Sequence, residues 1–427
     1  MKGNRIVGCG IVVSVLIVVL VVAAVLAITR PARMVRAEIA RIKAEGAPLT
    51  MKDLDGPKIP DSQNGAVIYQ KAFALVSTKD AKKDMAFIAR MASMAHPIKT
   101  EAEWKELRRV LAKYDGVVPL VRQAASRPEC RFPVGWEKSG ALEAGFTHLP
   151  ALRDLSRVLY AKAMVCARDG KPGEAARYID LGFALTDAMK YHPTLIVFYI
   201  RCDQISMFSY ALRNVLNSGN LSAEDARLLM HRLARIDLAG SLGQALEVER
   251  ATGIWTVDQM RPAHGAASPI WSIRCDLDEQ YFLTKMRQFI KYSSLPYRDV
   301  AGTDKLTGPV DIPKYAAMSA LCLPIVWHGP MDRDRSQSWV SGSRIALALG
   351  LYHDRHKAYP ANLDEVAGLL GGKLPIDPFS GKAFVYTRQG PGCLLYSIGP
   401  DLKDNGGKEP PPGKNLTDGG DIVWRMK

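Results

Sequence analysis

The chain has 427 residues, of which 48% are hydrophobic and 23% are charged. This composition excludes a mostly disordered chain, and the length exceeds what one compact core usually holds, so we expect two or three domains. The formal net charge of +14 indicates anionic partners such as lipid headgroups, wall polymers or nucleic acid.

The first element is an uncharged apolar run from Ile6 to Thr29. As a helix it would be about 35 Å long, enough to cross a bilayer core of about 30 Å. A cleaved signal peptide is the alternative, but its apolar core would span only about 7–15 residues. We therefore predict a single-pass anchor in the cell membrane, with residues 1–30 as its N-terminal tail and transmembrane segment.

Basic residues stand on both sides of this run, namely Lys2, Arg5, Arg30, Arg33, Arg36, Arg41 and Lys43. The surplus after the run favours a cytoplasmic position for the rest of the chain, but long following domains cross membranes regardless of such charges. The charges therefore leave the orientation open. Residues 31–61 are predicted to form a juxtamembrane helix near the lipid headgroups and then a linker, which is broken by Pro48, Pro57 and Pro60.

Residues 62–333 are predicted to form an α-helical domain. Apolar residues recur there at intervals of three and four, as in Leu152, Leu155 and Leu159. Asp61 or Ser62 is expected to cap the first helix, and Ser222 a later one. The segment 170–185 resembles the turn and second helix of a tetratricopeptide hairpin. That resemblance implies an irregular array of helices with a binding groove.

Catalytic and metal motifs are weak in this region and after it. Glu247 and Glu249 are two residues apart on a helix, so their side chains point to different faces. His353 and His356 lack a further ligand nearby and are predicted to be surface residues. The sequence holds no phosphate-binding glycine motif and no C-x-x-C pair. We predict that the protein is not an enzyme.

Aromatic residues between 251 and 333 stand near basic ones and could in principle stack on bases. They include Trp255 and Trp271, close to Arg274. No nucleic-acid-binding motif accompanies them, so we expect them to cover the helical core and expect no specific nucleic-acid partner.

Residues 334–427 are predicted to form a small α+β domain. It would begin with an amphipathic helix that ends at Tyr359-Pro360, followed by a short helix that Asn362 caps and Gly371 ends. A short antiparallel sheet follows, with strands predicted at Phe384–Thr387, Cys393–Ile398 and Asp421–Trp424. The predicted fold is thus mainly α, with a transmembrane helix, an irregular helical array and this C-terminal module.

The ordered motifs of the module resemble a known family. A helix ending in Tyr-Pro, then Leu-Pro-x-Asp-Pro-Phe-x-Gly, Leu-Tyr-Ser-x-Gly and a final Gly-Asp-Ile are similar to the C-terminal domain of type II secretion major pseudopilins. The apolar run lacks that family's Phe-Thr-x-x-Glu start, and the whole helical region separates it from the module. We therefore do not expect the chain to polymerise into a pilus.

The resemblance implies a calcium site in the loop between the last two strands, because calcium takes 6–8 oxygen ligands. The candidate ligands are Asp401, Asp404, Asn405, Asp418 and Asp421, with Ser397 as a further contributor. The alternative is a solvated loop without metal, and the sequence leaves both open.

These observations predict a membrane-anchored, non-catalytic scaffold or binding protein of the cell envelope. The resemblance implies that most of the chain lies outside the cytoplasm and contacts envelope or secretion-assembly proteins. Two alternatives are an envelope hydrolase with its site in the helical domain, and a binding module for anionic wall polymer or lipid. Membrane lipid is an expected partner in every case.

Overall fold

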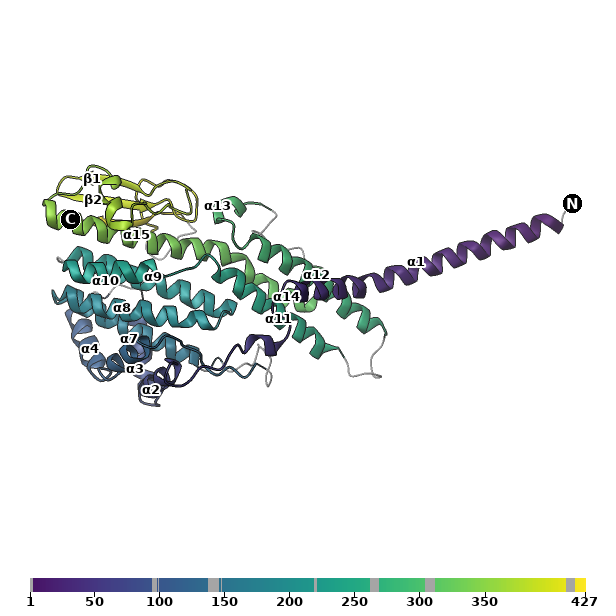
Figure 1. The fold of residues 1–427 in the computed structure, drawn as a ribbon, viewed down its shortest axis with the longest axis horizontal. Helices are drawn as coiled ribbons and strands as arrows, with labels where there is room; N and C mark the ends of the chain where they lie inside the picture. The colour runs from purple at the N-terminus through teal and green to yellow at the C-terminus, as the bar shows by residue number, and fades with distance from the viewer. Residues whose placement is uncertain are drawn as a thin grey trace.

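The computed structural model describes residues 3–93, 98, 100–136, 146, 148–218, 221–261, 269–303, 312–411 and 419–427. For residues 3–14, 269, 324, 325 and 327 it describes the backbone alone. The described chain is mainly helical, with a long N-terminal helix and a small three-stranded sheet near the C-terminus, as the sequence predicts (Figure 1).

Helix α1 runs without interruption from Gly3 to Ala44 and extends far from the rest of the molecule (Figure 1). Among the described residues it is the single helix long and apolar enough to cross a membrane. Pro31 lies inside the helix, after a turn whose carbonyls at Val25 and Leu26 accept hydrogen bonds from the side chains of Thr29 and Arg33. These bonds satisfy carbonyl oxygens next to the position where proline removes a donor.

The last turns of α1 belong to the folded domain. Val35 is 5% exposed and Ile42 is fully buried, and both pack in a core with α11 (Ser241–Met260) and α12 (Pro269–Tyr292). Glu38 forms an ion pair with Arg287 of α12. The helix that leaves the domain is therefore rigidly joined to it.

A bundle of antiparallel helices forms the part of the molecule farthest from the free end of α1 (Figure 1). We call it the distal bundle. Its helices are α2 (Ala66–Val76), α3 (Ala81–Met91), α4 (Glu101–Ala112), α5 (Val117–Ala125), α7 (His148–Arg168), α8 (Pro172–Ala188), α9 (Leu195–Ser218) and α10 (Ala223–Ala234). Small residues let these helices approach closely, since a methyl group on Gly182 would lie 2.1 Å from Phe208 Cε1.

The first residues of two helices in the distal bundle are set by capping side chains nearby in the sequence. Ser222 caps α10 by accepting a hydrogen bond from the Asp225 amide at 3.1 Å, as predicted. The predicted cap of α2 at Asp61 or Ser62 is wrong. The helix begins at Ala66, whose amide donates to Asn64 Oδ1 at 3.1 Å. The side chain of Asn64 is held in this position by two hydrogen bonds with the backbone of Arg131. Its Nδ2 donates to the Arg131 carbonyl, and its Oδ1 accepts from the Arg131 amide.

The proximal unit surrounds the base of α1. It consists of residues 34–44 of α1, α11, α12, the short helices α13 (Tyr297–Val300) and α14 (Ala317–Cys322), and the 3₁₀ helix η3 (Leu323–His328). Asp278, which is 5% exposed, accepts hydrogen bonds from the amides of Met318 and Ser319 at 2.8 and 3.1 Å. A buried carboxylate on α12 thus fixes the start of α14.

Helix α15 (Gly329–His356) connects the proximal unit to the C-terminal module. Pro330 stands in its first turn, a position that suits proline, and the helix runs across the boundary that the sequence predicts between residues 333 and 334. Near its start, Arg333 donates to the carbonyls of Ser293 and Leu295, while Asp334 accepts from the Tyr297 amide at 2.6 Å.

The C-terminal module packs its sheet against α15 (Figure 1). Strands β1 (Val385–Gln389), β2 (Gly392–Ser397) and β3 (Ile422–Met426) are antiparallel in the order β1-β2-β3. Trp424 is fully buried and lies over Gly342 of α15, where a methyl group would come within 2.2 Å of its ring. The predicted short helix is a 3₁₀ helix, η4 (Leu363–Leu370), capped by Asn362.

Candidate functional site

A large groove opens between the linker that follows α1, helix α2, the segment 131–136 and helix α11. Its cavity volume is about 870 Å³. That volume lies within the range of about 300–1,000 Å³ found for ligand pockets. The groove is lined by acidic, apolar and aromatic side chains together with a few basic and amide groups. They include Asp53, Asp55, Pro57, Lys58, Ile59, Asp61, Val67, Gln70, Arg131, Phe132, Val134, Trp136, His192, Gln244, Glu247 and Val248.

The floor of the groove is apolar. Phe132, Val134 and Trp136 are each less than a tenth exposed, and Val248 of α11 packs with Val134 and Trp136 in a small separate core. Because these side chains are already nearly buried, the apolar area that a ligand could still cover comes mainly from the more exposed lining residues Pro57, Ile59 and Val67.

Hydrogen bonds hold the linker as one wall of the groove. Thr50 and Asp53 form a reciprocal capping box around the 3₁₀ helix η1 (Met51–Leu54). The guanidinium of Arg131 donates to the carbonyl of Asp55 at 2.9 Å and to that of Pro57 at 3.4 Å. The wall is therefore fixed from a segment more than seventy positions away in sequence.

The rim of the groove has an excess of negative charge. Four carboxylates line it, those of Asp53, Asp55, Asp61 and Glu247, against the two cations Lys58 and Arg131. Hydrogen bonds from the amides of Leu49 and Thr50 lower the pKa of Asp53, so it is ionised at neutral pH. In the part of the chain that the structure describes, Glu247 makes no hydrogen bond or ion pair.

His192 is the histidine at the groove, and its ring is buried. Nε2 lies 3.0 Å from the Phe132 carbonyl, and burial lowers the pKa of the imidazole. The ring also packs against His148, with ring centroids 5.3 Å apart. His192 is thus a neutral part of the wall. The groove can hold a ligand through apolar contact and negative charge.

The acidic loop of the C-terminal module brings together four of the predicted calcium ligands. Asn405 Nδ2 donates to Asp401 Oδ2 at 2.9 Å, and the amides of Asn405 and Gly407 donate to the two carboxylate oxygens of Asp421. Asp404 Oδ1 accepts hydrogen bonds from the Tyr396 hydroxyl and the Gly406 amide. Each carboxylate therefore ties the loop to itself or to β2.

Ser397 does not belong to this group. Its hydroxyl donates to Asp377 Oδ1 at 2.7 Å, on the opposite side of β2 from the loop. Asp377 is 1% exposed and also accepts the amides of Phe379 and Ser380, which forms the turn after the Leu-Pro-x-Asp sequence. Ser397 thus supports a buried turn.

The sixth candidate, Asp418, lies outside the described residues. Within the described ranges no three His, Cys, Asp or Glu side chains are placed to hold a metal ion together. The oxygens of Asp421 accept hydrogen bonds from backbone N–H groups, but burial outweighs these bonds and raises the pKa of the carboxyl. Calcium binding stays a prediction. A calcium-dependent rise in the melting temperature of the full chain, lost in Asp421→Asn, would establish it, and an unchanged melting temperature would contradict it.

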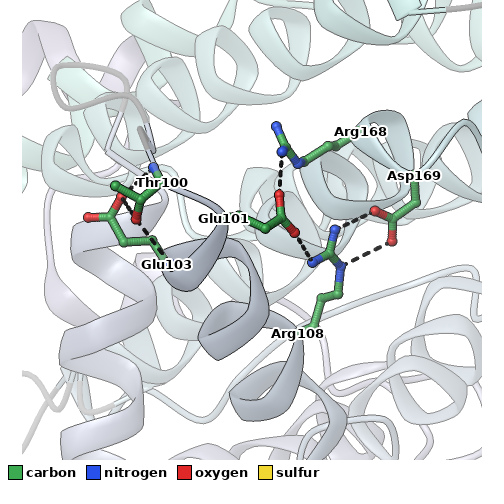
Figure 2. A network of polar contacts seen from close by, with 6 residues as sticks. All are labelled: Thr100, Glu101, Glu103, Arg108, Arg168 and Asp169. Carbon is green, nitrogen blue, oxygen red and sulfur yellow. Dashed lines mark hydrogen bonds and ion pairs between the residues drawn. The ribbon is translucent and has the colours of Figure 1, made fainter.

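A second charged cluster lies on the surface of the distal bundle (Figure 2). Glu101 at the start of α4 pairs with Arg108 at 3.1 Å and with Arg168 of α7 at 2.5 Å. Arg108 also binds Asp169 through two nitrogens, at 2.6 and 3.3 Å. Every member has a partner within the cluster, so it serves to clamp α4 onto the end of α7.

Sequence reasoning missed the groove because its four walls are far apart in the chain. The linker was predicted to be a spacer, and Glu247 was considered only together with Glu249. The one available signal was the acidic and proline-rich composition of residues 53–61, which contrasts with the basic chain as a whole. Comparison with models of known protein families, with curated proteins and with solved structures gives no match.

Proposed function

We propose that this protein is a membrane-anchored, non-catalytic binding protein that holds a basic, extended polypeptide segment in the groove. The observation that carries the proposal is the acidic rim over an apolar floor. In a chain with a net charge of +14, this local reversal of sign selects a cationic ligand.

The linker wall supports a polypeptide as the occupant. Residues 56–60 are without regular secondary structure. Within the described chain, the backbone groups of Lys58 and Ile59 make no hydrogen bonds. An extended segment can pair with such a free stretch of backbone while alternate side chains reach the floor and the rim.

The N-terminal helix and the C-terminal module support a location for the protein in the cell. Helix α1 has the length and apolarity of a membrane anchor. The ordered motifs of the C-terminal module resemble those of major pseudopilins, and the module folds as a helix packed against a three-stranded sheet. Both features support a place at the cell envelope with the domains outside the cytoplasm, next to a secretion or pilus-like assembly. Protease added outside intact cells should then cleave the domains while residues 1–30 stay protected.

The proposal is tested by fluorescence anisotropy with the full chain in detergent and two short labelled peptides. One alternates lysine and leucine, and the other alternates glutamate and leucine. We expect the lysine peptide to bind, the glutamate peptide not to bind, and the affinity for the lysine peptide to fall as salt rises. Equal binding of both peptides would contradict the proposal.

A charge reversal at the rim provides the matched test. Glu247→Lys should weaken binding of the lysine peptide by about tenfold, since the change costs on the order of 1 kcal/mol of interaction free energy. Glu224→Lys makes the same change on the exposed surface of α10, outside the groove, and should leave the affinity unchanged. The same loss in both variants would show that net charge alone binds the peptide.

A further inference from the structure

The joined ends of α11 and α12 expose large apolar side chains. Ile270 is 70% exposed, and Trp271 and Met260 are about 40% exposed. These three residues come from the last turn of α11 and the first turn of α12. We call them the hairpin end. Exposed apolar groups brought together in this way mark a contact surface.

The position of the hairpin end relative to the anchor follows from two contacts between α1 and α12. Gln280 Nε2 lies 3.3 Å from Met34 Sδ, and Arg287 pairs with Glu38 further along both helices. The residue numbers rise together, so the two helices run in parallel. Moving from Gln280 toward the start of α12 therefore leads in the same direction as moving along α1 toward its apolar run.

The distance along the axis places the hairpin end at the membrane boundary. Trp271 lies nine residues before Gln280, which is about 14 Å at 1.5 Å per residue. An equal run along α1 from Met34 reaches Val25, in the last turn or so of the apolar segment that closes at Thr29. Figure 1 shows the start of α12 on the side of the domain from which α1 extends.

The side chains at the hairpin end have the chemistry of a bilayer interface. Tryptophan is enriched at the headgroup level of membranes, where an apolar body meets a polar layer. Trp271 is held by a hydrogen bond from Nε1 to the Met260 carbonyl at 3.1 Å, which ties the two helix ends together. Arg274, one turn further along α12, is exposed, as are Arg30 and Arg33 of α1.

Acidic residues lie next to the hairpin end and share one arginine. Asp276 and Glu279 both pair with Arg261, at 2.8 and 2.6 Å, and Asp258 lies 3.9 Å from the same guanidinium. Arg261 partly offsets their charge, which leaves the apolar residues as the part of the hairpin that meets the lipid.

We infer that the hairpin end inserts into the interface of the same bilayer that α1 crosses, as a second membrane contact. This rests on the proposed anchoring by α1. One helix would leave the domain free to tilt, whereas two contacts fix its angle to the membrane. The groove, which lies between the linker and α11, is then presented in a fixed orientation.

Quenching of tryptophan fluorescence by brominated phosphatidylcholine in nanodiscs tests the inference on the full chain. The chain has seven tryptophans, so the contribution of Trp271 is the difference between the wild type and Trp271→Phe. We expect bromines close to the headgroups to quench most of this contribution. Trp255→Phe is the control, because Trp255 packs on α11 against the core of Met51, Val134 and Trp136, and its contribution should remain unquenched.

A tryptophan placed in α1 separates the inference from its premise. In Val18→Trp the new indole should be quenched by bromines deep in the acyl chains. If Val18→Trp is quenched and Trp271 is not, the second contact is refuted while the anchor stands. If neither is quenched, the anchor itself fails, and the second contact fails with it. Equal quenching of Trp255 and Trp271 would also overturn a contact localised at the hairpin end.

Discussion

The distal bundle and the proximal unit are both helical, but different interactions hold them together. The distal bundle packs mainly through alanine, leucine and phenylalanine, and its largest charged cluster lies on the surface. It also buries charged side chains, among them Lys162 and Asp180, but against a much larger apolar core. The proximal unit buries charged groups within and around its core. Asp278, Glu279 and Asp334 are each no more than 5% exposed, and each accepts hydrogen bonds from a different segment.

The difference indicates what each part is for. A bundle with an apolar core is a stable support whose geometry follows from its helix faces. A unit built on buried carboxylates depends on specific partners, since a buried acceptor that loses its donors costs free energy. The proximal unit is where α1 meets the domain, and Arg287 with Glu38 adds a further pair there. Its polar contacts fix one arrangement of α1 relative to the groove.

The largest effect is expected from Asp278→Ala. The change leaves the amides of Met318 and Ser319 without their buried acceptor, and it should lower the free energy of unfolding by about 3 kcal/mol. Thermal or urea unfolding measures this loss. Asp258→Ala, on the exposed surface of α11, should change stability little. Equal losses in the two variants would contradict the role of the buried carboxylate.

Adding a methyl group at a tightly packed helix glycine should destabilise the distal bundle and the proximal unit to a similar extent. A methyl group on Gly253 would lie 2.2 Å from Phe282 Cε1 in the proximal unit, and Gly182 has the same relation to Phe208 in the distal bundle. Each change to alanine should cost about 1–3 kcal/mol of unfolding free energy. Gly350→Ala on α15, where no atom lies within 4 Å, should instead stabilise the protein by about 0.5–1 kcal/mol.

Glu249 should make the stability of the proximal unit depend on pH. Burial raises the pKa of its carboxyl, which accepts the Leu195 amide at 3.2 Å. Between the pKa of the unfolded chain and this raised value, only the folded protein holds the proton. The free energy of unfolding should therefore fall as pH rises through that window and stay level above it. Glu249→Gln keeps the acceptor and should remove this part of the pH dependence, which melting curves from pH 4 to pH 8 would show.

The smallest effect is expected from Arg108→Ala in the surface cluster of the distal bundle (Figure 2). Its removal leaves Asp169 to solvent while Glu101 keeps its pair with Arg168, and exposed ion pairs contribute little to stability. The melting temperature should fall slightly at low salt and not at all at high salt. A large fall in melting temperature that persists in high salt would contradict this prediction, because it would mean that the surface cluster contributes strongly to the stability of the distal bundle.

The sequence predicted those parts of the fold that depend on neighbouring residues. An uncharged apolar run predicted α1, and short apolar runs between turn sequences predicted the three strands close to their observed positions. The cap at Ser222 is also a contact over three residues. The cap of α2 was misassigned because the residue at the cap position is Gly65, and the Ala66 amide is bound by the side chain of Asn64 instead of Asp61 or Ser62. Asn64 is selected by its bonds to Arg131, which lies in another part of the chain.

The same distinction between local and distant contacts applies to the two candidate sites. Asp401, Asp404, Asn405 and Asp421 lie together in the acidic loop, and calcium binding by them stays a prediction. Ser397 was misplaced because alternate residues of a strand face opposite sides, and the side chain of Tyr396 faces the loop instead. The groove could not be predicted, because the wall at Asp55 is held by Arg131 and the opposite wall is α11. No local pattern encodes such contacts.

The most direct test of the proposed binding function is to map where the peptide binds. The lysine–leucine peptide, carrying a photoreactive benzophenone, is cross-linked to the full chain in nanodiscs, and the modified residues are identified by mass spectrometry. The proposal predicts cross-links in the linker at residues 53–61, on α2 at Val67 and Gln70, and on α11 at Gln244 and Val248. Cross-links gathered on the C-terminal module or spread evenly over the exposed surface would contradict it.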